Sequence, residues 1–294
     1  MEDNNQVEST VLGHRVEYPQ TYDPKILVAV PRRLNRRLYG LDDAALPFVG
    51  YDTWHAYELG FLTEKGLPVQ AVLKIVYPAT SPSIVESKSL KLYLNSFNME
   101  RIGRTPAEGL RQVTATIAAD LSRLLGAKVR VNPFTAFQQQ IQYDFTGFMA
   151  LENEPGMTDI EFDCYTENPS LLQPSGRSGQ MLVSTHLLRS NCKITRQPDW
   201  GSAFVRIKGR SLPTPESLLR YLVSIRSENH FHEEICEMIY KRLLDAFAPS
   251  EMSVSCIYTR RGGIDICPTR ASHQHLLPQH LPNPFTMTRK LLRQ

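Results

Sequence analysis

The stretches WHAYELGF (residues 54–61) and VQAVLKIVY (residues 69–77) decide the fold of the first half of this chain. Apolar and polar residues alternate in both, which is typical of strands that bury one face. The second half contains a comparable pair, MLVSTHLL (residues 181–188) and AFVRIK (residues 203–208). The sequence therefore predicts that each half begins with two strands of an antiparallel sheet.

Two predicted helices follow each strand pair. In the first half, one helix begins near Ser87, and the next begins at the capping box Thr105–Glu108 and ends at Gly126. In the second half, one helix begins at Thr214, which precedes a proline, and another begins near His232. Each half then continues with a strand-like stretch, KVRVNPF (residues 128–134) or MSVSCIY (residues 252–258).

The order β-β-α-α-β therefore occurs twice, and Tyr93–Ser96 and Tyr221–Ser224 occupy matching places in the two units. The alternative is a chance similarity within one α+β protein. We expect an α+β fold in which each unit is an antiparallel sheet with two helices on one face. A proline- and serine-rich stretch, residues 167–179, is typical of a linker. We predict an N-terminal segment at residues 1–25, a first domain at residues 26–166 and a second domain at residues 180–294.

The composition of the 294-residue chain is that of an ordinary soluble protein, with 41% hydrophobic and 21% charged residues. Its net charge of +3, from 33 basic and 30 acidic residues, gives no support to binding of nucleic acid or of a membrane. The polar, acidic start MEDNNQVEST does not resemble a secretory signal. Five cysteines without a CxxC pair favour reduced thiols and a cytoplasmic protein.

Cys192 differs from the other four cysteines, because its neighbours in SNCKITRQPDWG (residues 190–201) are polar and include Lys193 and Arg196. Nearby cations raise the thiolate fraction of a cysteine. We expect an exposed sulfur that is either a nucleophile, with Asp199 accepting and returning its proton, or a solvent-side residue without a role. The remaining cysteines are expected to be small hydrophobic residues in or near the core: Cys164, Cys236, Cys256 and Cys267.

HFHEE (residues 230–234) places a histidine and two glutamates at the start of a helix. Acidic residues are favoured there by the helix dipole, so simple capping is one interpretation. The other is recognition, because a fixed carboxylate such as that of Glu233 accepts two N–H groups side by side. His232 can transfer a proton near neutral pH.

ESKSLKLYLNSFN (residues 86–98) places Lys88, Lys91 and Asn95 on one polar helix face, which is either a solvated surface or an anion site. RRGG (residues 260–263) combines arginines with a turn that allows close backbone approach. A zinc site from Cys192, His230 and His232 is not expected, because no close cysteine pair is present. The pair His273 and His275 lies in a proline-bearing segment, so we expect no metal there either.

Taken together, these stretches closely resemble the two-domain form of the QueF family. Its members are NADPH-dependent 7-cyano-7-deazaguanine reductases, the nitrile reductases of queuosine biosynthesis. The resemblance covers most of the chain beyond roughly residue 25 and rests on five stretches: GYDTWHAYEL (50–59), ESKSLKLYLNSFN (86–98), SNCKITRQPDWG (190–201), YLVSIRSENHFHEE (221–234) and RRGGIDICPTR (260–270). It implies the tunnelling fold (T-fold) of β-β-α-α-β-β units, with ligands bound between units, and a homodimer.

The resemblance also implies that each half carries part of one site. The first half has ESKSLK but no cysteine between its first strands and no His-Glu pair near Thr105. The second half has Cys192, Asp199 and the His232–Glu233 pair, but Thr-Pro-Glu where ESK would fall. One composite site per chain is therefore expected.

By the same resemblance, Cys192 adds to a nitrile carbon to form a thioimide, Asp199 transfers protons, and His232 donates a proton later. Glu86, Ser87, Phe231 and Glu233 would bind the substrate. Lys88, Lys91, Arg261 and Gly262 would bind NADPH, with Arg260 and Arg270 as further candidates. No GxGxxG motif follows a strand, so Rossmann-type binding is excluded. The alternatives are a zinc-dependent cyclohydrolase of the same fold and a non-catalytic purine- or pterin-binding protein; RNA binding is disfavoured by the balanced charge.

Overall fold

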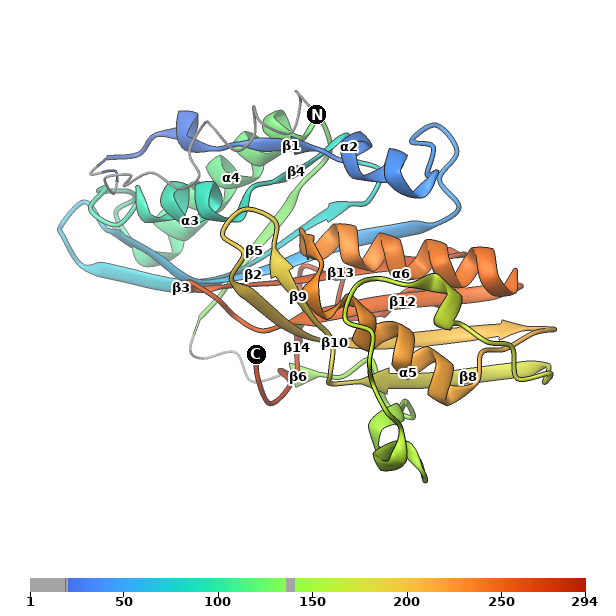
Figure 1. The fold of residues 1–294 in the computed structure, drawn as a ribbon. Helices are drawn as coiled ribbons and strands as arrows, with labels where there is room; N and C mark the ends of the chain where they lie inside the picture. Colours follow the sequence, from blue (N-terminus) through green and yellow to red (C-terminus); the bar gives the residue numbers. More distant parts are fainter. Residues whose placement is uncertain (1–18, 20, 136–140) are drawn as a thin grey trace.

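Strands from both halves join in one central sheet, which helices cover on one face (Figure 1). The computed structural model describes residue 19, residues 21–135 and residues 141–294. Most of the predicted N-terminal segment, residues 1–25, therefore lies outside the described residues. The predicted α+β class is confirmed, because helices and a mostly antiparallel sheet are both present.

The first half contains the strands and helices that its sequence predicts. They are β2 (Val49–Leu62), β3 (Pro68–Pro78), α3 (Ser87–Asn95), α4 (Pro106–Leu125) and β5 (Arg130–Phe134). Both predicted ends of α4 are confirmed. The Thr105 hydroxyl accepts a hydrogen bond from the Glu108 backbone N–H at 3.2 Å, and Gly126 follows the helix with φ +59°. That left-handed conformation suits glycine and ends the helix.

The second half repeats this order and adds two strands, β9 and β13. Its main elements are β8 (Gly179–Thr185), β9 (Arg189–Cys192), β10 (Pro198–Gly209), α5 (Pro215–Ser224), α6 (His232–Phe247), β12 (Glu251–Tyr258) and β13 (Ile264–Ala271). The predicted strand MLVSTHLL ends early, at Thr185, and a separate strand, β9, begins at Arg189. The reason is that the long β10 pairs with two shorter strands in succession, β9 near its start and β8 further along.

Short elements complete the described chain. The short strands and the short α-helix are β1 (Ala29–Pro31), α2 (Arg33–Arg36), β4 (Ser83–Val85), β6 (Ile141–Gln142), β7 (Met149–Ala150), β11 (Asn229–His230) and β14 (Met287–Thr288). The 3-10 helices are Pro24–Ile26, Arg37–Tyr39, Leu151–Asn153, Met157–Asp159, Pro169–Leu171, Ile225–Ser227 and Gln274–Leu276. Of the helices in the described part of the chain, none has the length and apolar character needed to cross a bilayer.

The two halves share one sheet, where the sequence predicts a separate sheet in each. Its strand order is β11-β9-β10-β12-β13-β2-β3-β5, with β8 beside β10 and β7 beside β8. The join is the antiparallel pair β13–β2, whose register runs from Ile264 opposite Ala56 to Ala271 opposite Val49. Each unit would otherwise leave an unpaired edge strand, and pairing the two edges satisfies their backbone N–H and C=O groups.

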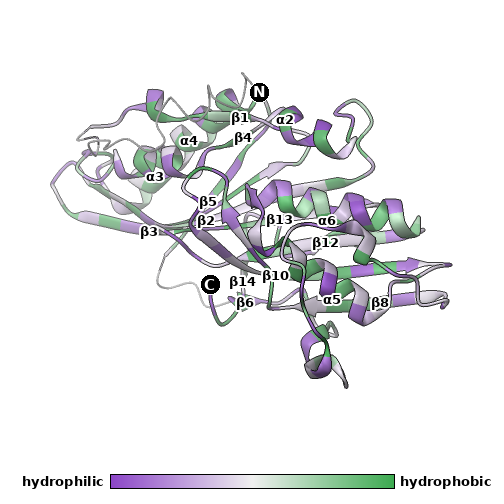
Figure 2. Cartoon of the chain, in the orientation of Figure 1, coloured by the Kyte–Doolittle hydropathy of each residue, from purple (hydrophilic) through white to green (hydrophobic). Residues whose placement is uncertain are grey.

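Both helix pairs lie on the same face of this sheet. Ile266 of β13 packs in the core beneath α3 and α4, whereas Arg270, on the same face of that strand, contacts Glu237 of α6. The apolar residues form two main clusters, each built mostly from one half, although Phe48 joins the second-half cluster and Ile264 and Ile266 join the first-half cluster. Figure 2 shows polar and apolar residues alternating along α5 and α6, as expected of helices with one face on a sheet.

The opposite face of the sheet is covered by the C-terminal segment. Leu281 packs there against Phe204, Ile257 and Cys267. The buried Lys74 ammonium donates to the backbone carbonyls of His280 and Thr286, at 2.8 and 2.7 Å. Leu151, which precedes the predicted linker, and Leu172, which lies within it, both pack in the second-half core.

All five cysteines are free thiols. The predicted core position is confirmed for three of them. Cys236, Cys256 and Cys267 are buried in the core. Cys164 is only half-buried and lies in an irregular segment, so the expectation of a core position is wrong for this cysteine.

Candidate active site

Cys192 and Asp199 are brought together by the hairpin of β9 and β10. Asp199 pairs with Ser190 across the two strands, and Cys192 follows Ser190 by two residues, so all three share one face. The Cys192 backbone N–H donates to the Gln197 carbonyl at 2.8 Å and closes the turn, in which Arg196 has φ +55°. The expectation of an exposed sulfur is wrong: Cys192 is 9% exposed, because its face of the hairpin is turned toward a cavity and the adjoining turn takes the solvent side.

The HFHEE stretch lies directly beside Cys192. β11 runs parallel to β9 and places His230 opposite Cys192, so α6 begins two residues later next to the thiol. Glu234 caps this helix, because its carboxylate accepts from the Phe231 backbone N–H at 3.1 Å. It also pairs with Lys193 at 3.1 Å and with His230 at 3.1 Å. The capping interpretation is therefore confirmed for Glu234, which leaves Glu233 available for another role.

Asp199 joins a histidine and an arginine. Its Oδ2 lies 3.3 Å from His232 Nε2, at ion-pair distance but without a well-aligned hydrogen bond, and its Oδ1 lies 2.9 Å from Arg261 Nη1. The His232 ring packs on Tyr258, with ring centroids 3.9 Å apart. Catalytic hydrogen bonds are often long before a ligand binds. A proton can therefore pass between Asp199 and His232 after a small side-chain movement.

Glu233 is buried at 2% exposure and does not cap the helix. Burial, together with the nearby negative charge of Asp52, raises the pKa of Glu233 to about 8, although Arg32 opposes the shift. The hydroxyl of Tyr77, a residue of β3, donates to Glu233 Oε1 at 3.4 Å. The glutamate is thus set among groups from the first half.

A buried network of charges lies behind Glu233, where the halves meet. Asp52 pairs with Arg32 and, at 2.8 Å, with Arg270. Arg270 also donates to Glu237 at 2.8 Å, and Arg36 donates to the same carboxylate. Arg270 is therefore wrong as a candidate for a cofactor phosphate, because it is 0% exposed and its guanidinium is already paired with two carboxylates.

The start of α3 faces the same cavity from the first half. The Glu86 carboxylate caps the helix, accepting from the backbone N–H groups of Lys88 at 2.9 Å and Ser89 at 2.7 Å. The ammonium groups of Lys88 and Lys91 have no carboxylate partner within residues 21–135 and 141–294. Solvation alone does not explain their position, because both side chains line a cavity and are partly buried.

The RRGG stretch forms the tight turn that the sequence predicts, between β12 and β13. Gly262 and Gly263 both have positive φ, and Arg261 exchanges backbone hydrogen bonds with Ile264. A Cβ on Gly262 would lie 3.0 Å from Lys91 Nζ, so glycine allows the lysine to reach the turn. Arg260 points elsewhere, with its guanidinium 4.2 Å from the centre of the Tyr57 ring.

These elements enclose a cavity of about 210 Å³, the outer cavity, to which both halves contribute. Its lining includes Glu86, Ser87, Lys88 and Lys91 from the first half and Cys192, His232, Thr259, Arg261 and Gly262 from the second. Further in, an inner recess of about 10 Å³ lies beside Asp199, Phe231 and Glu233. This recess has room for about one water, so a ring reaches Glu233 only after the lining side chains move.

The outer cavity has the donor set that a phosphate-bearing cofactor requires. Lys88, Lys91 and Arg261 supply positive charge, and the Gly262 turn supplies close backbone. The two lysines are unpaired with carboxylates in the described residues, which fits binding of an anion. Arg261 is already paired with Asp199, so it connects the lysines of the outer cavity to the β9–β10 hairpin that carries Cys192.

One residue that lines the inner recess and one that contacts Glu233 from outside this lining were not predicted from the sequence. Trp54 lines the recess, and its buried indole N–H lies near the Tyr77 hydroxyl without a well-aligned hydrogen bond. Tyr77 contacts Glu233 as described above. Both lie in alternating strands, where a large aromatic residue ordinarily indicates a core position, so the only available signal was the polar atom that each carries.

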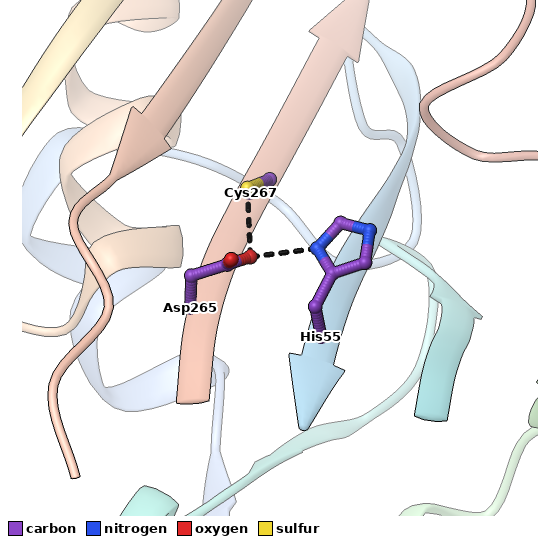
Figure 3. Close-up of side chains that lie close together, drawn as sticks. All are labelled: His55, Asp265 and Cys267. Carbon is purple, nitrogen blue, oxygen red and sulfur yellow. Dashed lines mark hydrogen bonds and ion pairs between the residues drawn. The ribbon is translucent and has the colours of Figure 1, made fainter. Parts of the chain in front are cut away.

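His55, Asp265 and Cys267 form a second buried cluster, on the face of the sheet opposite the helices (Figure 3). His55 Nδ1 lies 2.6 Å from Asp265 Oδ1, and the Cys267 thiol donates to the same oxygen at 3.5 Å. Lys290 Nζ lies 3.0 Å from Asp265 and 2.9 Å from His55, so an ammonium already supplies the positive charge. Burial lowers the pKa of His55 to about 4 and keeps the imidazole neutral.

A cavity shared by two halves, with a thiol beside a histidine–aspartate pair, is typical of enzymes that use a cysteine nucleophile. Two family models match the chain. The model described as "Nitrile reductase, 7-cyano-7-deazaguanine-reductase N-term" matches residues 18–133, and the model described as "QueF-like protein" matches residues 198–276.

Three curated relatives are each named NADPH-dependent 7-cyano-7-deazaguanine reductase. The protein of Chromohalobacter salexigens is 41% identical over 266 residues, 90% of this chain and 92% of its own length. That of Stenotrophomonas maltophilia is 42% identical over 91% of this chain and 94% of its own length. That of Coxiella burnetii is 39% identical over 90% of this chain and 92% of its own length. The chain belongs to the family of NADPH-dependent 7-cyano-7-deazaguanine reductases, so the resemblance stated from the sequence is confirmed.

Proposed function

We propose that this protein reduces the nitrile of 7-cyano-7-deazaguanine to the primary amine, 7-aminomethyl-7-deazaguanine, in the biosynthesis of queuosine. Family membership supports the reaction, and one observation carries its assignment to residues. That observation is the outer cavity, in which Cys192 and His232 of the second half meet Lys88 and Lys91 of the first. Neither the zinc-dependent cyclohydrolase nor the non-catalytic binding protein is favoured by the relatives.

Cys192 is the nucleophile in this proposal. Its Sγ adds to the nitrile carbon, and the thiol proton passes to Asp199, which returns it to the nitrile nitrogen. A carbon–sulfur bond forms while the triple bond becomes a double bond, so the product is a covalent thioimide. The hairpin that places Asp199 and Cys192 on one face supports this pairing.

His232 completes the proton transfers. Its position 3.3 Å from Asp199 supports a role as the donor to the substrate nitrogen in the second half of the reaction. NADPH supplies hydride when bound, and a nitrile and its amine differ by four electrons, so two equivalents and two protons are consumed for each nitrile. Lys88, Lys91, Arg261 and the Gly262 backbone are the residues proposed to hold it.

Glu233 is proposed to bind the N–H edge of the deazaguanine ring from the inner recess. A carboxylate that accepts from a ring N–H and an adjacent amine makes two parallel hydrogen bonds. Phe231 would pack on the ring face, and Ser87, which lines both the outer cavity and the inner recess, would contact the ring from the first half. Glu86 would complete the site, in addition to capping α3.

The finer features of the fold and assembly are part of the same proposal. The repeated β-β-α-α-β order supports two T-fold domains, residues 26–166 and 180–294, that together act as a homodimer. Free thiols support a cytoplasmic enzyme. We expect it to act on the free base and to bind neither nucleic acid nor membranes.

The proposal is tested by mixing the protein with 7-cyano-7-deazaguanine and following NADPH oxidation at 340 nm. We expect two NADPH oxidised per amine formed. Without NADPH, intact-protein mass spectra should show a covalent adduct of one nitrile on the wild type and none on Cys192→Ala. Cys164→Ala, which removes a half-buried thiol outside the cavity, is the control and should keep the adduct. An adduct that persists in Cys192→Ala would remove Cys192 from the role of nucleophile.

A further inference from the structure

Tyr77 is the first-half residue whose side chain bonds to Glu233. It belongs to β3, is fully buried, and its hydroxyl donates to Glu233 Oε1 at 3.4 Å. Nothing in the proposed reaction requires a tyrosine at this place. The contact crosses from one half of the molecule to the other and reaches Glu233, which, unlike Asp199, pairs with no cation in the part of the chain that the structure describes.

The surroundings of Tyr77 keep its hydroxyl protonated. Burial, together with the negative charges of Glu233 and Asp52, raises the pKa of Tyr77 well above its ordinary value. The phenol therefore stays protonated at any working pH, and it donates to Glu233 when that side chain is ionised, as it is above the raised pKa of about 8 or when the N–H groups of a bound ring stabilise the carboxylate. Its ring is held by Trp54, with centroids 6.5 Å apart, and by the Arg32 guanidinium, 5.8 Å from the ring centre.

A carboxylate reads two adjacent N–H groups only when its plane is aligned with them. The terminal torsion of a glutamate is broad, so an unrestrained carboxylate loses this alignment easily. Each carboxylate oxygen has two acceptor sites. Tyr77 can therefore engage one site of Oε1 and leave both oxygens open toward the recess.

We infer that Tyr77 is a positioning residue that orients the Glu233 carboxylate toward a ring carrying an N–H group beside an exocyclic amine. This inference rests on the proposed function, because it assumes that such a ring enters the inner recess. It assigns part of the ligand specificity to the first half. The second half supplies the carboxylate, and the first half sets the angle at which the ligand meets it.

The test compares two ligands: 7-cyano-7-deazaguanine and the analogue that lacks the exocyclic 2-amino group. Equilibrium binding of both is measured in the Cys192→Ala background, where no adduct complicates the affinity. With Tyr77 present, the amino ligand should bind at least tenfold more tightly. In Tyr77→Phe this preference should fall by about tenfold, the value of one lost hydrogen bond, while affinity for the analogue changes less than about threefold.

Tyr240→Phe is the matched control. Tyr240 lies on α6, the helix of Glu233, and its hydroxyl also crosses to the first half, donating to the Pro47 carbonyl at 3.0 Å. Loss of this bond should leave the preference unchanged. If Tyr77→Phe does not fold, Tyr77→Met removes the same donor with less aromatic volume to place, and the same loss of preference is expected.

Equal weakening of both ligands by Tyr77→Phe would overturn the inference, because a merely structural residue acts on both alike. An unchanged preference would overturn it as well. Failure of the proposed function gives a different result, since the Cys192→Ala parent would then bind neither ligand.

Discussion

The two helices that open into the cavity, α3 in the first half and α6 in the second, begin in similar ways and carry different chemistry. A glutamate satisfies free backbone N–H groups at each start, Glu86 in α3 and Glu234 in α6. The neighbouring residues differ: α3 presents Lys88 and Lys91, whereas α6 presents His232 and Glu233. A repeated framework thus brings two helix starts to one cavity and leaves their side chains free to specialise.

The largest effect on activity is expected when the second half loses its proposed proton acceptor, Asp199. In Asp199→Asn the side chain keeps its shape but no longer accepts the thiol proton. We expect kcat to fall by roughly 10²–10⁴-fold and adduct formation to slow by a similar factor, measured by NADPH oxidation and by intact mass. Ligand affinity should change little.

Asp163→Asn is the control, because Asp163 is exposed and outside the cavity. Adduct formation at the wild-type rate in Asp199→Asn would show that the thiol loses its proton to another group.

The next test concerns the seam between the two halves, which is formed by the β13–β2 strand pair and the buried charge network beside it. We expect the halves to unfold as one unit. Asp52→Asn leaves Arg32 and Arg270 buried without their shared carboxylate, which should cost about 3 kcal/mol of folding free energy. Calorimetry should show a Tm lower by roughly 6–12 °C, with a single transition. Asp245→Asn breaks an exposed pair with Lys241 and should lower the Tm by less than about 2 °C. Two separate transitions in the wild type would mean that the halves unfold independently.

A smaller effect is expected when the first half loses its two cavity lysines, and it should appear in the KM for NADPH and not in the KM for the nitrile. Lys88→Ala combined with Lys91→Ala removes two cations from the cavity. We expect the KM for NADPH to rise about 10–30-fold while the KM for the nitrile changes less than about threefold, from steady-state rates. Lys65→Ala, an exposed lysine of the same half, should change neither. An equal rise for both substrates would contradict the assignment of the lysines to cofactor phosphates.

The smallest effect contrasts two buried histidines. Burial lowers the pKa of His55, in the first half, to about 4. Burial also opposes charge on His230, in the second half, but hydrogen bonds to Glu228 and Glu234 outweigh it and raise its pKa to about 9. A raised pKa stabilises the fold fully below pH 6.5, and this stability is lost as pH rises to about 9. A lowered pKa has the opposite sign: the stability from neutral His55 is lost as pH falls from 6.5 to about 4.

Plots of Tm against pH should therefore decline on both sides of neutrality, for different reasons in the two halves. His230→Gln should remove the decline between pH 6.5 and 9, because the group whose pKa is raised is gone while Lys193 continues to pair with Glu234. The decline below pH 6.5 should remain. A variant that still loses stability between pH 6.5 and 9 would assign that loss to another group.

Local signals in the sequence predicted most of the fold. Alternation predicted β2 and β3, and the caps at Thr105 and Thr214 predicted where α4 and α5 begin. The β13–β2 seam was not predicted, because pairing between strands so far apart in sequence leaves no local pattern. Strand β9 was not recognised for a similar reason: its four residues are too few to show a period.

The residues predicted from motifs lie around one cavity in the structure, whereas the position of a residue with distant partners was not predictable. Arg270 was a further candidate for a cofactor phosphate, because the sequence does not show that it pairs with Asp52 and Glu237, which are 218 and 33 residues away. The burial of Cys192 was missed because its sequence neighbours are exposed while its own side chain faces inward. Tyr77 was missed because a tyrosine in an apolar strand is normally a core residue.

The seam between β13 and β2 has a consequence for the newly made chain. During synthesis β2 emerges early, yet its outer edge has no partner until residues 264–271 leave the ribosome. Unpaired edges attract other strands, and contacts between distant residues form slowly. The nascent protein must therefore carry an open sheet edge for most of its translation, which makes this strand the point where aggregation is most expected and where a chaperone would act.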